Sequence, residues 1–140
     1  MVGKSFEKLR VYLLAEELAD SVWDIVQTWN AFARDTVGKQ IVRSADSVGA
    51  NISEGYGRGT YPDNRRFVRM ARGSLYETRH WLRRAYRRKL LNQVQIDSLK
   101  AVIRNLGPQL NAYLKSIGKS SPNNPPNKPP LASDESPDDQ

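Results

Sequence analysis

The stretch NRRFVRMARGSLYETRHWLRRAYRRKLL, residues 64–91, predicts one long helix with two opposed faces. At about 100° per residue, a heptad pattern gathers small and aromatic residues on one side, which we expect to face the core: Phe67, Ala71, Ser74, Thr78, Trp81 and Ala85. The opposite side carries arginines around one tyrosine: Arg65, Arg69, Arg72, Tyr76, Arg79, Arg83 and Arg87.

A second apolar strip lies between these two faces and consists of Val68, Leu75, Leu82 and Tyr86. One packed face inside a monomer would not require this strip. If it were exposed, it would form a contiguous apolar patch of the kind that marks an interface. The strip therefore predicts a closed homo-oligomer that substitution of Leu75 or Leu82 by Asp would dissociate.

The positive charge of the chain is concentrated in the same region. The net charge is +7, and residues 58–89 hold eleven Lys and Arg against two acids, which is +9. Such a concentrated field indicates a polyanion such as nucleic acid, either RNA or DNA. The alternative is a solvated helix face that keeps the protein soluble, although such faces usually mix charges of both signs.

The composition argues against catalysis, cofactors and metals. The chain has no cysteine and a single histidine, His80, so thiolate sites and paired imidazoles within one chain are excluded. The pattern places no histidine beside Ser44, Ser47 or Ser53, and an activated nucleophile needs a base within hydrogen-bond reach. We expect a protein that is not an enzyme.

The sequence near Met1 has no pattern of a signal peptide, and no apolar run approaches the ~20 residues of a membrane span. The expected location is the cytoplasm, without a membrane partner.

Four amphipathic segments and no strand pattern predict an all-α, antiparallel up-down-up-down four-helix bundle. Asp35 is the expected N-cap of the second helix, and Asn51 and Glu54 are expected to be buried hydrogen-bonding groups within it. The glycines from 55 to 59 end that helix, and Thr60 or Tyr61 caps the next one. The predicted helices cover residues 6–29, 35–56, 64–91 and 94–117, within a bundle domain of residues 1–118.

Residues 119–140 hold six of the eight prolines, four acids and almost nothing apolar. Such a segment cannot bury enough surface to order itself, so we expect a disordered, Pro-rich acidic tail.

The pattern Q-x-x-R-x-x-x-S-x-x-x-N-I-x-E-G-x-x-R, then F-x-x-x-A-x-G-S-L-x-E, closely resembles the four-helix bundle proteins encoded in 23S rRNA intervening sequences. The residues that carry it, to which the resemblance gives structural or interface roles, include Gln40, Arg43, Ser47, Asn51, Glu54, Gly55, Arg58, Gly73, Ser74 and Glu77. The resemblance covers roughly Phe6 to Ile117.

The resemblance implies a bacterial protein, an antiparallel bundle and a ring-forming homo-oligomer, with a pentamer favoured. The family is similar to the accessory variability determinant of diversity-generating retroelements, a basic bundle that works with a reverse transcriptase and nucleic acid. No enzymatic activity is assigned to it. The arginines between residues 79 and 88 are denser than the family's usual pattern.

Two functions follow from the cationic face. The leading hypothesis is a non-enzymatic, homo-oligomeric nucleic-acid-binding protein whose arginines contact phosphates. The runner-up is a protein-interaction module that docks an acidic partner on the same face. Tyr76 either stacks on an unpaired base or lies at the helix surface with its hydroxyl in water.

Overall fold

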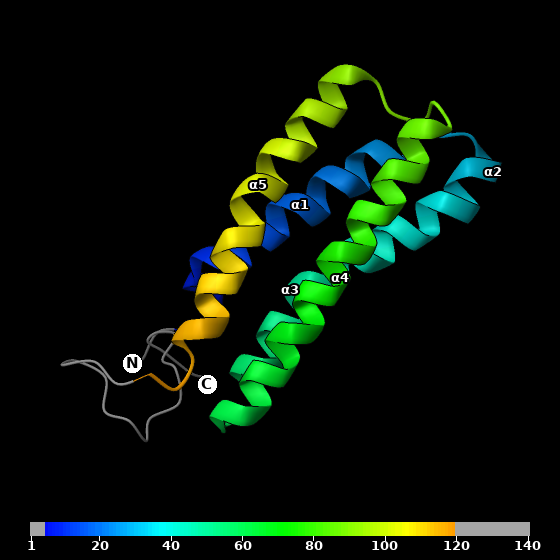
Figure 1. Cartoon of the computed structure of the whole chain (residues 1–140). Coiled ribbons are helices and arrows are strands. Elements are labelled where there is room, and N and C mark those ends of the chain that lie inside the picture. The colour runs from blue at the N-terminus through cyan, green and yellow to red at the C-terminus, as the bar shows by residue number, and fades with distance from the viewer. Residues whose placement is uncertain (1–4, 120–140) are drawn as a thin grey trace.

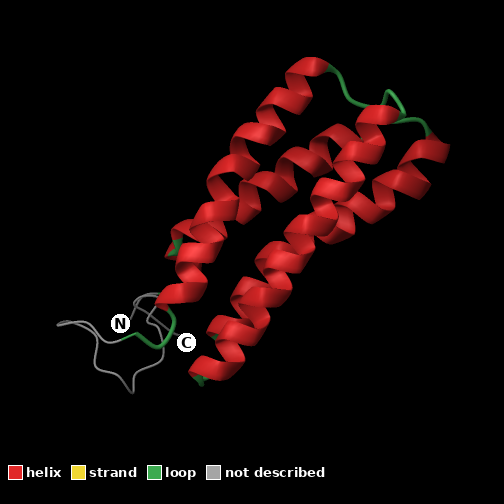
Figure 2. Cartoon of the chain, viewed as in Figure 1, coloured by secondary structure: helices red, strands yellow, loops and turns green. Residues whose placement is uncertain are grey.

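The computed structural model describes residues 5–119, and the predicted acidic tail lies outside them except for Lys119. Every regular element in this part of the chain is helical (Figure 2). The elements are the short turn η1 (Phe6–Lys8), α1 (Arg10–Val26), α2 (Ala31–Ala33), the π-helical turn η2 (Arg34–Gly38), α3 (Lys39–Tyr56), α4 (Tyr61–Arg87) and α5 (Gln93–Ser116).

The four long helices form an antiparallel bundle in which α1 packs on α3 and α5, and α4 packs on the same two helices (Figure 1). Two contacts establish the opposite directions of neighbours. Thr78, late in α4, reaches Ser44, early in α3, while Arg65, early in α4, donates to the backbone of Ile117 after the end of α5. The predicted all-α up-down-up-down bundle is confirmed.

Side-chain caps fix where the helices begin. The Asn30 side chain accepts a hydrogen bond from the Ala33 N–H at 3.0 Å, so the second long helical segment starts at Ala31 and runs through η2 into α3. The predicted N-cap, Asp35, is therefore wrong: it lies inside the helical segment, exposed and paired with Arg34 at 3.4 Å. Thr60 caps α4 as predicted, by accepting from the Asp63 N–H.

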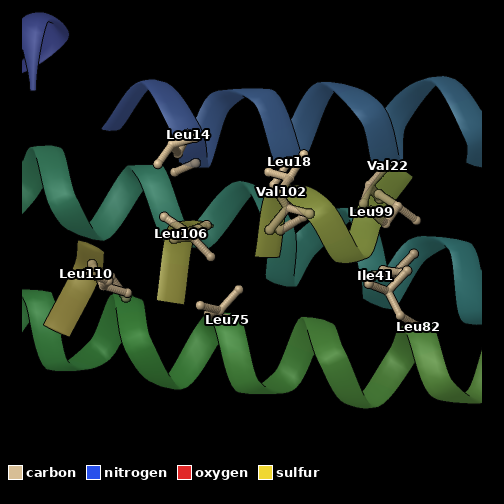
Figure 3. Packing of buried hydrophobic residues seen from close by; sticks show 14 of the residues in the cluster. Leu14, Leu18, Val22, Ile41, Leu75, Leu82, Leu99, Val102, Leu106 and Leu110 are labelled. Carbon is tan, nitrogen blue, oxygen red and sulfur yellow. The ribbon is translucent and has the colours of Figure 1, made fainter. Parts of the chain in front are cut away.

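The core runs along the bundle axis and draws aliphatic side chains from all four long helices. Figure 3 shows Leu14, Leu18 and Val22 of α1 facing Leu99, Val102 and Leu106 of α5. Helix α3 contributes one apolar stripe to this core. Its members are all buried: Ile41, Ala45, Val48, Ile52 and Tyr56.

The buried face of α4 is wider than the predicted one. Ala71, Thr78 and Ala85 of the predicted face are each 0% exposed, which confirms that half, whereas Phe67, Ser74 and Trp81 are only partly buried. The strip residues Val68, Leu75 and Leu82 are also buried, at 0%, 4% and 7% exposed. A helix that packs between two neighbours buries an arc of 100° or more, wider than the seam of a two-helix contact. Because α3 and α5 both cover α4, the strip faces the core.

The prediction that this strip is an exposed interface is consequently wrong. Among its four residues only Tyr86 is exposed, at 48%. Substituting Leu75 or Leu82 would test the core of the chain rather than an assembly of copies. Trp81 is not fully buried, so its truncation should cost less than that of a fully buried aromatic.

Helices α3 and α4 cross closely at Gly55. A Cβ atom at this position would lie 2.7 Å from Asn64 Oδ1, 2.9 Å from Phe67 Cβ and 3.0 Å from the Asn64 carbonyl oxygen. Two of these atoms belong to backbone or to the stem of a side chain, so they cannot move aside at little cost. The absence of a side chain at Gly55 is what permits this contact.

Candidate nucleic-acid interface

The predicted cationic face of α4 divides into two groups. Arg65 and Arg72 turn toward α5, where Arg65 Nη1 donates to the Ile117 carbonyl at 3.1 Å and Arg72 Nη1 donates to Asn111 Oδ1 at 3.3 Å. The remaining predicted members are exposed to solvent: Arg69, Tyr76, Arg79, Arg83 and Arg87. The seven residues therefore do not act as one uniform surface.

Several of these residues line an open groove between α4 and α5. It has a volume of about 1070 Å³, and Arg72, Arg79 and Arg83 form its α4 rim. Lys100 and Arg104 on α5 form the other rim. This second rim was not predicted from the sequence. Two basic residues four positions apart beside an apolar stripe are the pattern that indicates it.

The groove is electrostatically one-sided. Arg72, Arg79, Arg83, Lys100 and Arg104 line it together with His80, and no carboxylate among the described residues does so. The ion pairs formed within residues 5–119 all lie elsewhere, at Arg34–Asp35, Arg58–Glu54 and Arg66–Asp63. The five cations are therefore not neutralised by neighbours and are available to an anionic ligand.

The floor of the groove is apolar, and two tyrosines stand at its edge. Tyr76 and Tyr86 are 59% and 48% exposed, and the guanidinium carbon of Arg79 lies 5.3 Å from the centre of the Tyr76 ring. That distance permits a cation–π contact, which orients the ring. The floor consists of aliphatic side chains from both helices: Leu75, Leu82, Ile96, Leu99 and Ile103.

A second, smaller hollow lies between α1 and α3. Its volume is about 330 Å³, and Glu16, Asp20 and Asp46 line it together with Tyr12. Burial raises the pKa of Tyr12 to about 12, with the charge of Glu16 adding to the effect. Burial, followed by the nearby charge of Asp20, also raises the pKa of Asp46. This side of the bundle is acidic and suited to cations rather than phosphates.

The motif residues have several distinct roles. Gly55 allows the α3–α4 crossing, and the Asn51 side chain donates to the Ser47 carbonyl at 2.9 Å. Glu54 is exposed and pairs with Arg58 at 3.2 Å, so the prediction that Glu54 is buried is wrong.

The other motif residues lie at or near the surface of the chain. Gln40 and Ser74 are partly buried, and Arg43 is exposed. Glu77 Oε2 accepts from Trp81 Nε1 at 3.1 Å, and a Cβ at Gly73 would meet nothing within 4 Å. Packing within one chain therefore does not account for Gly73 or Arg43, and an interface role for them stays a prediction.

The serines have partners other than a catalytic base. Ser44 Oγ lies 2.9 Å from Thr78 Oγ1 in the core, and Ser53 Oγ donates to the Ala50 carbonyl at 2.9 Å. His80 is exposed beside Trp81, with ring centres 4.8 Å apart.

Within residues 5–119, no group of three His, Cys, Asp or Glu side chains is arranged to hold a metal ion. Over the same residues, no helix is both long and apolar enough to cross a bilayer.

Within residues 5–119, the fold and the groove define an all-α bundle protein with a basic groove between its last two helices, lined there by no carboxylate. The model of the family described as 23S rRNA-intervening sequence protein matches residues 7–112, and the chain belongs to this family. The resemblance seen in the sequence is thereby confirmed.

A solved structure supports the same fold. The chain is similar to a protein of unknown function from the S23 ribosomal protein family of Bacteroides thetaiotaomicron, with 23% identity and a TM-score of 0.68. The match covers 76% of this chain and 96% of that chain. No curated protein matches the chain.

Proposed function

We propose that this chain is a non-enzymatic, cytoplasmic protein that binds nucleic acid through the α4–α5 groove and the α4 arginines beside it. The observation that carries the proposal is the lining of the groove, where five Lys and Arg side chains meet no carboxylate among the described residues. Cations that lie beside one another without acids between them create a positive potential that concentrates anionic ligands.

The spacing of the rim fits a chain of phosphates. Arg72 and Arg83 are eleven residues apart, which is about 16 Å along a helix at 1.5 Å per residue. Phosphates on one strand of a duplex recur about every 3.4 Å along its axis. One rim therefore faces several phosphates, and Lys100 and Arg104 approach the same strand from the opposite side.

Binding of this kind gains its free energy from release of counterions and carries no sequence information. RNA and DNA are both expected ligands. The affinity should fall linearly with salt on a log–log scale, with a slope of about −0.7 for each phosphate neutralised on a single strand.

A salt titration with a fluorescent oligonucleotide tests the proposal. Wild type is compared with a groove variant, Arg79→Gln, Arg83→Gln and Arg104→Gln, and with a control of equal charge loss, Arg10→Gln, Arg34→Gln and Lys39→Gln. The control positions are exposed and lie outside the groove.

We assume that each arginine holds one phosphate and that the electrostatic contribution to affinity vanishes near ~1 M salt. The log–log salt slope of the groove variant should then be shallower by about 2, and its affinity at ~50 mM salt should be several hundredfold lower. The control should lose much less. Absence of wild-type binding at ~50 mM salt, or equal weakening by both variants, would contradict the proposal.

The apolar floor of the groove favours a second candidate, a module that docks an acidic protein segment. Binding to a phosphate backbone alone has no need of Ile103, which lines the groove and is only partly buried. Another copy of the chain offers such a segment, since α1 exposes Leu13 and Trp23 near Glu16 and Asp20. Homo-oligomerisation, with a pentamer favoured by the family resemblance, is part of the proposal in either case.

Light scattering of nucleic-acid-free protein distinguishes the two candidates. Docking of α1 into the groove predicts a mass above that of the monomer that falls when Glu16 and Asp20 are both replaced by Lys. If the oligomer survives this change, copies associate through another surface and the groove is left free for nucleic acid.

A further inference from the structure

We infer that the α4–α5 groove takes single-stranded nucleic acid, with unpaired bases against Tyr76, Tyr86 and the apolar floor, and phosphates on the two basic rims. The inference rests on the proposed function and narrows it, because it excludes duplex as the preferred ligand. The groove combines cations, exposed aromatic rings and aliphatic side chains.

Two exposed tyrosines lie beside the groove. Tyr76 and Tyr86 each expose about half of their surface beside the groove, at 59% and 48%. An exposed tyrosine next to cations supplies a flat face on which any base can stack. The guanidinium of Arg79, 5.3 Å from the Tyr76 ring centre, adds a second planar group at the same place.

The floor of the groove is apolar. It is closed by Leu75, Leu82, Ile96 and Leu99, each at most 8% exposed, and partly buried Ile103 lies among them and offers apolar surface that a base can reach. A duplex presents phosphates outward and keeps its base faces stacked inside, so it cannot place them against these side chains. A single strand can turn its bases inward and keep its phosphates outward, and this arrangement matches an apolar floor between charged rims.

The length of the groove can be compared with that of a nucleic-acid strand. The lining on α5 extends from Gln93 to Asn111, which is about 27 Å along the helix axis. Tyr76 and Tyr86 are ten residues apart, or about 15 Å. At one end the hydrogen bond from Arg72 to Asn111, 3.3 Å long, joins the two rims. The groove is therefore long enough for several nucleotides.

An oligonucleotide without bases provides the sharpest test, because it keeps every phosphate. We compare a fluorescent single strand, an abasic strand of equal length and the corresponding duplex at several salt concentrations. Wild type should bind the abasic strand at least about fivefold more weakly than the complete strand, the equivalent of one stacked base. The salt slope should be the same for both strands, since their phosphates are equal in number.

Variants then locate the effect. Tyr76→Leu with Tyr86→Leu should lose most of the difference in affinity between the complete strand and the abasic strand, whereas Tyr76→Phe with Tyr86→Phe should keep the wild-type difference. Trp23→Leu is the control, since Trp23 is 54% exposed and lies on α1 outside the groove. It should behave as wild type. Circular dichroism melts check that each variant is folded.

The outcomes separate this inference from the proposed function. If wild type binds none of the three ligands at ~50 mM salt, the proposed function itself is wrong. If it binds the abasic strand or the duplex as tightly as the complete strand, only the single-strand inference is overturned. The same holds if the Leu variant keeps the base-dependent difference, or if it changes the mass of the protein instead of its nucleic-acid binding.

Discussion

The α4–α5 groove and the α1–α3 hollow are both spaces between two helices, yet they differ in size and in charge. The groove has a volume of about 1070 Å³ and five cations, and the hollow has about 330 Å³ and three carboxylates. Small residues bring α1 and α3 together, since a Cβ at Gly49 would lie 3.4 Å from Tyr12 Cε1 and 3.7 Å from Ala15 Cβ.

This contrast shows that the size and charge of side chains between two helices determine which ligands can enter the space between them. Small side chains at a helix crossing narrow the space between the helices. Partial burial beside that space raises the pKa of Asp46, although the residue as a whole stays exposed. Long arginine side chains keep their heads in water, so the groove stays open and its charges stay solvated. A large ligand can therefore enter the α4–α5 groove but not the α1–α3 hollow.

The largest change in stability is expected from a substitution at the bottom of the groove. Leu75→Ala should lower the free energy of unfolding by about 2–5 kcal/mol, because it leaves a cavity in the core. Leu13→Ala on the exposed face of α1 is the control and should change stability by no more than about 0.5 kcal/mol. Urea denaturation measures both. Similar small losses would show that the groove floor does not belong to the core.

Two alanine substitutions in α3 separate the hollow from the α4 contact. Gly55→Ala should destabilise by about 1–3 kcal/mol, because the new methyl group overlaps Asn64 and Phe67. Gly49→Ala should stabilise by about 0.5–1 kcal/mol, because its methyl group makes ordinary contacts and helix propensity improves. Thermal melts of the two variants give the comparison, and a loss at Gly49 would mean that the hollow is already tightly packed.

The acidic side should show a smaller, pH-dependent effect at Asp46. Burial raises the pKa of this carboxyl in the folded chain, so the folded state disfavours its charged form. Below the pKa of Asp46 in the unfolded chain the carboxyl is protonated in both states and costs no stability. As the pH rises through the higher pKa of the folded chain, the free energy of unfolding falls. Asp46→Asn should therefore stabilise the protein at neutral pH and lose this advantage in acid. Urea unfolding between pH 3 and pH 7 measures the difference, which a pH-independent gain would contradict.

The smallest effect is expected when the charge of the hollow is changed and nucleic-acid binding is measured. Glu16→Gln with Asp20→Asn removes two acids from the side opposite the groove, about 20 Å away across two helix diameters. This distance exceeds the Debye length of about 8 Å at 0.15 M salt, so affinity should rise less than about twofold there and more at low salt. A large gain at 0.15 M would show that the two regions communicate by another route.

The sequence predicted a buried face best where aliphatic residues repeat along it. In α3 such residues recur every three or four positions and are buried. The predicted face of α4 mixed small, polar and aromatic residues, and it left out the aliphatic residues Val68, Leu75 and Leu82, which also face the core. The start of the second helical segment was misplaced because Asn30 and Asp35 are both good N-caps.

Half of the candidate site was visible in the sequence. The α4 arginines stood out because they recur on one face of one helix. Lys100 and Arg104 did not stand out, since two cations on another helix gain meaning only when α5 lies beside α4. The sorting of Arg65 and Arg72 toward α5 likewise depends on partners more than 35 residues away in the chain.

The opposite charges on the two sides of the bundle give the molecule an electric dipole across its width. In the field of a long polyanion such a molecule is expected to turn before contact, with α4 and α5 leading, which raises the fraction of collisions that are productive. If the chain binds nucleic acid as proposed, the α1–α3 side with its carboxylates would point outward. A bound row of molecules would then present an acidic exterior that repels further nucleic acid, so coverage is expected to stop at one layer.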